Sequence, residues 1–473
     1  MLGKGVHQEV MLSIIKNSSL KSSSLKSSSM GGLLGLLLFM LPVSMTGMEI
    51  FGWLTAFVGL GVMLKARVRA TSDLQLRVGP DYFLWGLLTI VVISGVLSEA
   101  SFKGLIEIIG DFRWILLLYG YSYFLRWFAM NRKKNLLTSL LFKVFIPVTI
   151  VVSLYGLFQS ITGIDLIRPE KDWPSCTNFP GKDFIYSLST KNCRISGFFS
   201  NPMTYAHMFV MWFCVLFTQL FVGKSSLSRK VLLGVALGTM GCSLIFSLTR
   251  GVWISGTAGL LVMLWLLGFK QFLRGVTALS ILAVVGMVFF APVRERVISI
   301  FGTKSGSNRQ RIVLWQVQKE IFKDYPFFGI GYGKNRQRFD EYLVRLGKDP
   351  KKTFHGNAHN IYLEFLAGTG VLGLFCFLGI LVYFILLAYK LWRKIPPEYP
   401  QDRALALGTI GAMVSLAVGG LTENNFTDQE VNHNIIFILA IVVALAYKHL
   451  KCCPGLSSVF INGSSQRDSS PPR

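Results

Sequence analysis

Residues 353–373 read TFHGNAHNIYLEFLAGTGVLG, in which a polar His-Asn pair runs directly into a long apolar segment. The apolar segment predicts a membrane helix, and the polar residues before it mark the place where the membrane meets water. A histidine there can take a proton from a water-borne molecule while a lipid-borne molecule approaches through the bilayer. The side of the membrane on which this histidine lies therefore matters for function.

The composition of the whole chain is that of a membrane protein. Of its 473 residues, 52% are hydrophobic and 15% are charged, which excludes an ordinary soluble globular domain. About twelve apolar runs have the length of a membrane span, so we expect an all-α polytopic helix bundle. The runs are residues 31–46, 48–64, 82–98, 113–130, 138–161, 201–223, 231–249, 251–269, 275–292, 359–391, 403–421 and 431–448.

Positive charge in the loops orients this predicted bundle. With the N-terminus in the cytoplasm, all twelve spans place the basic short loops inside, as the positive-inside rule requires. These basic segments are KARVR (65–69), NRKKN (131–135), GKSSLSRK (223–230), FKQFLR (269–274), YKLWRK (389–394) and YKHLK (447–451).

The predicted spans divide the chain into seven segments, and we expect no cleavable signal peptide. In order they are a basic Ser-rich cytoplasmic leader (1–30), N-terminal spans (31–161), an outer loop (162–200), a transmembrane core (201–292), a large basic and helical outer loop between spans nine and ten (293–358), C-terminal spans (359–448) and a cytoplasmic tail (449–473).

The first outer loop contains Cys176 and Cys193. Thiols outside the cytoplasm oxidise, so we predict a disulfide between them; two unpaired thiols are the alternative. The other cysteines lie in spans or in the cytoplasmic tail, where we expect no redox role. They are Cys214, Cys242, Cys376, Cys452 and Cys453.

The second outer loop, residues 293–358, is strongly basic. Its fourteen Lys and Arg against six Asp and Glu give +8, a third of the net +24 of the whole chain. Such a surface suits an anionic partner such as a phospholipid head group, a lipid pyrophosphate or a phosphorylated sugar, and we expect no nucleic acid there. A solvated basic loop without a ligand is the alternative.

An amphipathic helix is predicted inside this loop. Leu314, Val317 and Ile321 repeat at helical spacing, Ser307 or Asn308 can cap the start, and Pro326 ends the helix. We expect it to lie on the membrane face or to roof the bundle, with Arg311 in its first turn. A guanidinium there can hold phosphate oxygens in pairs. The GIGYG run after it lacks a Walker lysine and predicts a turn.

Two features mark the outer ends of other spans. Arg250 lies in a short turn between two apolar runs, where an arginine either snorkels to the interface or serves a site. Asn201-Pro202 breaks the backbone where the sixth span begins, which is a way to open a cavity in a membrane protein.

His359 is the candidate catalytic residue, although a lone histidine at a helix end is more often a cap or an interfacial residue. His355 and His359 are spaced like a zinc-binding pair, but Gly356 and Asn357 between them favour a loop, and we expect no metal. The acidic turn at 421–430 supplies candidates that could orient a histidine or bind a sugar hydroxyl. Candidates for lining the donor or acceptor site are Asn201, Asn360, Glu423 and Asp428.

The order of these motifs over residues 195–440 resembles the O-antigen ligase family of bacterial polytopic membrane proteins. It is also similar to the related O-antigen polymerases and protein O-oligosaccharyltransferases. The motifs that carry the resemblance are Ser200-Asn201-Pro202, Ser247-x-x-Arg250-Gly251, Arg311-x-x-x-Trp315, PFFGIG at 326–331, His359-Asn360-x-Tyr362-Leu363-Glu364 and GVLG at 370–373.

The resemblance implies a metal-independent glycosyltransferase of the bacterial inner membrane, without a cofactor, whose site faces the periplasm. It would move a glycan from undecaprenyl pyrophosphate to a hydroxyl of an acceptor, which for a ligase is lipid A-core. By motif, Arg250 and Arg311 would bind the pyrophosphate and His359 would act in catalysis. Two guanidiniums can stabilise phosphate charge, and an imidazole suits a general base in a direct, inverting displacement.

Three other functions fit parts of the sequence. A polymerase would use the same core with a second lipid-linked glycan as its acceptor. A transporter of polysaccharide or lipid would explain the many spans, but it predicts paired broken helices that the chain does not display. A structural scaffold would leave the arginines and His359 without a role.

Overall fold

The computed structural model describes residues 29–68, 78–98, 102–131, 136–168, 176–178, 191–301, 306–334, 338–353 and 355–450. In these residues the fold is an all-α helix bundle, as the apolar runs predict. Nine of the described helices are long and apolar enough to cross a membrane, and Ser29–Met40 and Asp81–Leu97 are shorter apolar helices. Residues 1–28 and 451–473, with Cys452 and Cys453, lie outside the described residues.

The apolar helices occur where the sequence predicts spans. Ser29–Met40 is shorter than the run 31–46 because a turn follows it directly. In chain order, the next helices are α2 (Met45–Val68), α3 (Asp81–Leu97), α4 (Phe102–Asp111), α5 (Trp114–Asn131), α6 (Leu136–Leu140) continued by the π-helical η1 (Leu141–Phe145) and α7 (Ile146–Thr162), α9 (Pro202–Phe221), α10 (Leu227–Phe246), α11 (Arg250–Leu267), α12 (Phe269–Phe289), α16 (Ile361–Lys394), α17 (Pro400–Gly419) and α18 (Gln429–Leu450).

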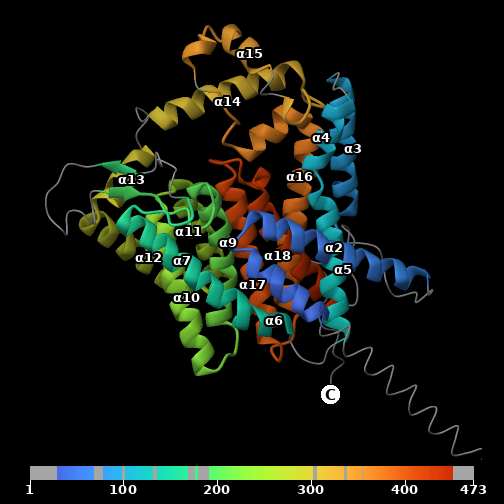
Figure 1. The fold of residues 1–473 in the computed structure, drawn as a ribbon, viewed down its shortest axis with the longest axis vertical. Coiled ribbons are helices and arrows are strands. Elements are labelled where there is room, and N and C mark those ends of the chain that lie inside the picture. The colour runs from blue at the N-terminus through green and yellow to red at the C-terminus, as the bar shows by residue number, and fades with distance from the viewer. Residues whose placement is uncertain are drawn as a thin grey trace, which may run out of the picture.

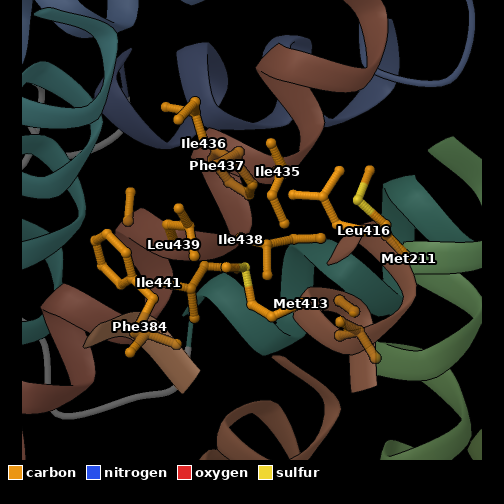
Figure 2. Packing of buried hydrophobic residues seen from close by; sticks show 14 of the residues in the cluster. Met211, Phe384, Met413, Leu416, Ile435, Ile436, Phe437, Ile438, Leu439 and Ile441 are labelled. Carbon is orange, nitrogen blue, oxygen red and sulfur yellow. The ribbon is translucent and has the colours of Figure 1, made fainter. Parts of the chain in front are cut away.

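Helix α18 is the centre of the bundle. Its residues from Val431 to Tyr447 are buried on all sides by other helices, so this helix does not face lipid. Figure 2 shows Ile435 and Ile438 of α18 packed near Met413 and Leu416 of α17 and Met211 of α9. Helix α12 is the opposite case, because none of its side chains is buried. Its mostly apolar surface is therefore suited to lipid.

The first predicted outer loop contains a short hairpin. Strands β1 (Cys176–Asn178) and β2 (Lys191–Cys193) pair antiparallel, with Cys176 opposite Cys193. Directly opposed residues of an antiparallel pair have Cα atoms about 4.5–5.5 Å apart, within the range that a disulfide spans. The side chains of both cysteines lie outside the described residues, so the disulfide remains a prediction that this register supports.

The second predicted outer loop is largely helical. It contains α13 (Ala291–Phe301), α14 (Gly306–Asp324), α15 (Phe339–Arg345) and the 3₁₀ turn η3 (Pro350–Lys352). We call residues 306–358 the arm. Figure 1 shows α14 and α15 at one end of the bundle and α6 toward the opposite end. We refer to the end with α14 and α15 as the arm end.

The apolar face of α14 is buried in a small core of its own. Leu314, Val317 and Ile321 are fully buried with Phe339 and Tyr342 of α15. This core also includes Ala367 of α16. Helix α14 therefore roofs the bundle, which is the second of the two placements that the sequence allows, and its apolar face is not left for the membrane surface.

A kink in α16 attaches the arm to the bundle. Gly370 has φ +67° inside the helix, which opens backbone groups of Ala367 and Gly368 there. The amides of Ile330 and Gly331 donate to the carbonyls of Ala367 and Gly368 at 2.9 and 3.1 Å. Ile330 and Gly331 lie in the GIGYG run (329–333) that the sequence predicts to be a turn, and this run docks the arm against α16.

Candidate functional site

The three main candidate residues meet in one cavity at the arm end. This cavity has a volume of about 310 Å³, and Arg250, Arg311 and His359 all line it, together with Glu423. They come from α11, α14, the residues before α16 and the turn between α17 and α18. Apolar side chains cover another part of the wall; they are Met203, Leu248, Ile254, Ile300 and Leu314. The cavity therefore joins a charged surface to an apolar one.

Arg250 is positioned by the short turn after α10. Leu248 in this turn has φ +52°, and α11 begins at Arg250 itself. The guanidinium donates to the carbonyl oxygen of Ser299 at 2.6 Å and to Oδ1 of Asn308 at 2.9 Å. Asn308, which the sequence suggested as a helix cap, thus connects α14 to Arg250. These bonds tie α11, α13 and α14 together around the cavity.

Arg311 lies deeper in its helix than the sequence predicts. The described part of α14 begins at Gly306, so Arg311 is in the second turn and not in the first. The free N–H groups of the helix start are therefore not the reason for its position. Its guanidinium instead donates to Oε2 of Glu423 at 3.1 Å, across the cavity wall.

Two more arginines, which the sequence did not single out, line the cavity. Arg194 follows β2, and its guanidinium donates to the carbonyl oxygen of Ser247 and to the hydroxyl of Thr249, both at 3.0 Å. Arg296 reaches the cavity from α13. Their sequence signal is a positive charge near the predicted outer end of a span, which many other loop residues share.

Four guanidinium groups therefore face one carboxylate, that of Glu423, in this cavity. Burial, with the nearby charge of Arg296, lowers the pKa of Arg194 to about 10. Burial also lowers the pKa of Arg296. Burial makes each positive charge less favourable, and a bound anion would offset that cost. The cavity is therefore electrostatically suited to an anion with several oxygens, such as a pyrophosphate.

Glu423 connects His359 to Arg311. Its Oε1 lies 2.6 Å from Nδ1 of His359, and its Oε2 accepts from Arg311 at 3.1 Å. Burial alone would raise the pKa of Glu423, but the hydrogen bond with His359 and the charges of His359 and Arg311 lower it below its usual value. Glu423 is therefore an anion at neutral pH.

The partner of Nδ1 decides which nitrogen of His359 is available. A carboxylate can only accept a hydrogen bond, so Nδ1 carries the proton that faces Glu423. In the neutral imidazole, Nε2 is then the unprotonated nitrogen. A histidine held in this tautomer can accept a proton at Nε2, and the product imidazolium is stabilised by the adjacent carboxylate.

The backbone around His359 is tightly held. His359 has φ +44°, its amide donates to Oδ1 of Asn357 at 3.1 Å, and Trp315 donates from Nε1 to the carbonyl of Ala358 at 2.8 Å. Asn360 then caps α16 by accepting from the amides of Tyr362 and Leu363, each at 3.0 Å. This segment fixes the imidazole at the cavity through bonds on both sides of it.

Of the remaining predicted residues, some cap helices and the others lie outside this cavity. Asn201 caps α9 through a 2.9 Å bond from the amide of Met203, and neither Asn201 nor Asn360 lines this cavity. Asp428 lines a second cavity and accepts from the hydroxyl of Thr204 at 2.7 Å. His355 contacts Asp340, whereas His359 contacts Glu423.

The sequence did not indicate a second histidine in the cavity wall. His207 of α9 is buried, its Nδ1 lies 2.8 Å from the carbonyl oxygen of Met203, and its Nε2 is buried without a hydrogen-bond partner. From the sequence alone it is one polar residue within an apolar span, with no motif to distinguish it.

Comparison with known families gave a match that includes most of the residues of this site. A family model described as O-antigen ligase matches residues 235–378. The matched region contains Arg250, Arg296, Arg311 and His359, whereas Arg194 and Glu423 lie outside it. A search of curated proteins found no match.

Proposed function

We propose, from the premise that this chain carries a domain of the O-antigen ligase family at residues 235–378, that it is an O-antigen ligase. The family match and the nine long apolar helices among the described residues support a multi-pass membrane protein of the ligase and polymerase type, whose members are glycosyltransferases. In the proposed reaction, polysaccharide moves from undecaprenyl pyrophosphate to a hydroxyl of lipid A-core. The reaction takes place at the periplasmic face of the inner membrane, without a metal ion.

The arginines would bind the donor. The pyrophosphate carries its charge on several oxygens, and Arg194, Arg250, Arg296 and Arg311 line the same cavity. As the glycosyl bond breaks, negative charge grows on the bridging oxygen of the leaving pyrophosphate. Fixed guanidiniums in a partly buried site stabilise that charge more than water would, because they need not reorganise. The apolar wall near Ile254 and Ile300 suits the first isoprene units of the donor.

His359 would activate the acceptor. Its Nε2 takes the proton from the acceptor hydroxyl while the hydroxyl oxygen bonds to the anomeric carbon, and the bond from that carbon to the pyrophosphate breaks. The leaving group departs with the bonding electrons as undecaprenyl pyrophosphate. A single displacement of this kind inverts the anomeric centre. Glu423 holds the imidazole and balances its charge after proton transfer, which is the part a third residue plays in other catalytic triads.

The observation that carries this proposal is the convergence of His359 and four arginines on one cavity. The test uses purified protein in nanodiscs with a lipid-linked glycan donor and a lipid A-core acceptor. Wild-type protein should release undecaprenyl pyrophosphate in proportion to transferred glycan. His359→Gln should lower kcat by about 10²–10⁴-fold while donor binding persists. Near-normal turnover by His359→Gln would remove histidine from the mechanism.

Gene deletion separates ligase from polymerase. Loss of a ligase leaves lipid A-core unmodified and lipid-linked polymer accumulated, which is the expected result on a gel of surface polysaccharide. Single repeat units still attached to lipid A-core would instead identify a polymerase.

A further inference from the structure

A second cavity of about 390 Å³ lies on the other side of the His359 segment. Asn357 lines it, and Asn357 also lines a neighbouring hollow together with His359. In the turn between α17 and α18, Glu423 faces the arginine cavity and the next residue, Asn424, faces the second one. The two cavities therefore lie next to each other along the 357–359 segment and the 423–424 turn, with His359 lining the arginine cavity and Asn357 lining the second one.

The two cavities differ in charge. The second cavity is lined by the carboxyl groups of Glu49, Asp111, Glu364 and Asp428 and by one guanidinium, that of Arg113. Arg113 is already paired with Glu49 at 2.6 Å. A phosphate that entered this cavity would meet mostly negative charge, whereas the arginine cavity attracts it. The second cavity therefore suits a ligand that is neutral or positively charged.

The rest of the lining is that of a site for hydroxyl groups. Trp114 and Phe426 form an edge-to-face pair with centroids 5.2 Å apart, and Phe112 and Tyr332 form another at 4.9 Å. All four line the cavity. Aromatic surfaces next to a few carboxylates and amides can pack against the C–H face of a ring while accepting from its hydroxyls.

Asn424 supplies an independent indication of a ligand. It lines the second cavity and is 4% exposed, yet its Oδ1 has no hydrogen-bond partner. A buried acceptor without a donor is unfavourable, so such atoms are rare in folded proteins unless something binds them. A sugar hydroxyl can donate to Oδ1 of Asn424 and to the carboxylates beside it.

We propose that this second cavity binds the sugar residue of the acceptor that carries the attacking hydroxyl, and that this sugar is neutral and bears no phosphate. The assignment rests on the proposed function. The donor pyrophosphate then occupies the arginine cavity and the acceptor sugar occupies the acidic aromatic cavity, with His359 between them. The charges of the two cavities distinguish the two substrates. The carboxylates of the second cavity repel the donor pyrophosphate, and the arginines of the first cavity favour an anion over a neutral sugar.

Two probes test the chemistry without requiring turnover. Methyl β-glucopyranoside and glucose 6-phosphate are offered separately to the full-length protein in nanodiscs, and binding is followed by saturation-transfer NMR. The neutral glycoside should give a signal that Asn424→Ala and Asp428→Asn each reduce. Glucose 6-phosphate should give a signal insensitive to both substitutions. Equal, substitution-sensitive signals from both probes would overturn the assignment.

Kinetics then separate this inference from the proposed function. Asn424→Ala and Asp428→Asn should each raise the KM for the acceptor about tenfold, the effect of one lost hydrogen bond, with donor KM and kcat within about twofold. Glu341→Gln, an exposed carboxylate on α15, is the matched control and should change nothing. Unchanged acceptor KM, or a shift in donor KM, with active wild-type protein would refute the second cavity alone. Wild-type protein that consumes no donor would refute the proposed function, while the NMR comparison would still test the cavity.

Discussion

His359 has φ +44°, a backbone conformation that residues other than glycine rarely adopt. Such a residue persists only where its surroundings hold it. Here the holding groups are the Asn357 side chain, the cap at Asn360 and the carboxylate of Glu423. Asn360 also donates from Nδ2 to the carbonyl of Leu421 at 3.0 Å, which ties the histidine segment to the turn that carries Glu423. The positions of the carboxylate of Glu423 and of the base His359 are thus set together.

Replacing Glu423 tests whether it positions His359. Glu423→Gln keeps an oxygen for the Nδ1 bond but removes the charge that stabilises the imidazolium and pairs with Arg311. We expect kcat to fall about 10–100-fold and the pH profile of kcat to shift, because the negative charge next to the imidazolium is removed. Glu341→Gln serves as the control, and the readout is the pH profile of kcat. A fall in kcat with an unshifted profile would indicate a purely structural role.

Asp428 makes a prediction about stability and pH. Burial raises the pKa of Asp428 from 3.8 to about 6. The folded protein therefore binds more protons than the unfolded chain between about pH 4 and 6, so stability falls as pH rises through that window and the full penalty is present above it. Asp428→Asn removes an ionisable group whose raised pKa costs about 3 kcal/mol at neutral pH.

Thermal unfolding of the purified protein checks this. The Asp428→Asn variant should melt several degrees above wild type at pH 7.5 and within about one degree of it at pH 4. Glu341→Gln should match wild type at both values, since an exposed pair contributes little. A variant less stable than wild type at pH 7.5 would contradict the sign of the effect.

At the level of elements, the kink of α16 explains how a polar arm is joined to an apolar bundle. The backbone groups opened at Gly370 bond to residues 326–331, with Val371 donating to the carbonyl of Pro326 at 2.8 Å. An unkinked α16 would satisfy these groups internally and leave the arm without an anchor. Because the arm carries Arg311 and the His359 segment, the kink positions the site although it does not line it.

Gly370→Ala should loosen this junction. A Cβ at Gly370 would lie 2.2 Å from the carbonyl carbon of Phe327, and φ +67° adds about 1–2 kcal/mol for any L side chain. Gly347 is a matched control, because it has the same φ but open space around its Cβ position. Limited proteolysis of the arm should be much faster in Gly370→Ala than in Gly347→Ala. Equal rates would mean that backbone strain, and not the contact with Phe327, decides the junction.

Across the whole molecule, the site is assembled where the arm, the α10–α11 turn and the α17–α18 turn meet. Helix α18 passes through the centre of the bundle and holds α5, α9 and α17 against one another, so these turns are rigidly placed (Figures 1 and 2). The proposed reaction needs this end of the molecule to face the periplasm, where a lipid-linked polymer and lipid A-core meet.

Cysteine labelling tests that orientation. Lys348→Cys in the arm should react with a membrane-impermeant maleimide in cells whose outer membrane has been permeabilised. Ser226→Cys, at an exposed position in the loop between α9 and α10 at the other end, should react only after the inner membrane is disrupted. Both variants are made in a chain without the seven native cysteines, and expression level is the control. The reverse pattern would place the cavity in the cytoplasm and exclude the proposed reaction.

The apolar runs alone are enough to predict the fold class and the approximate ends of the membrane helices. A segment in lipid must satisfy its own backbone hydrogen bonds, so a long apolar run has helix as its one solution. Motif order is likewise a local property, and Arg250, Arg311 and His359 can be selected from it. The turn at GIGYG follows from its glycines, and the end of α14 before Pro326 follows from the proline.

Contacts between segments far apart in the sequence could be known only from the three-dimensional structure. Glu423 and Asp428 are close in one acidic turn and look alike in sequence, yet one binds His359 and the other lines a separate cavity. Asn201 and Asn360 resemble site residues but act as helix caps. Arg194 and Arg296 carry no motif and still reach the cavity. The physical reason is that a side chain's hydrogen bonds and field depend on what the other helices place beside it, which local composition does not encode.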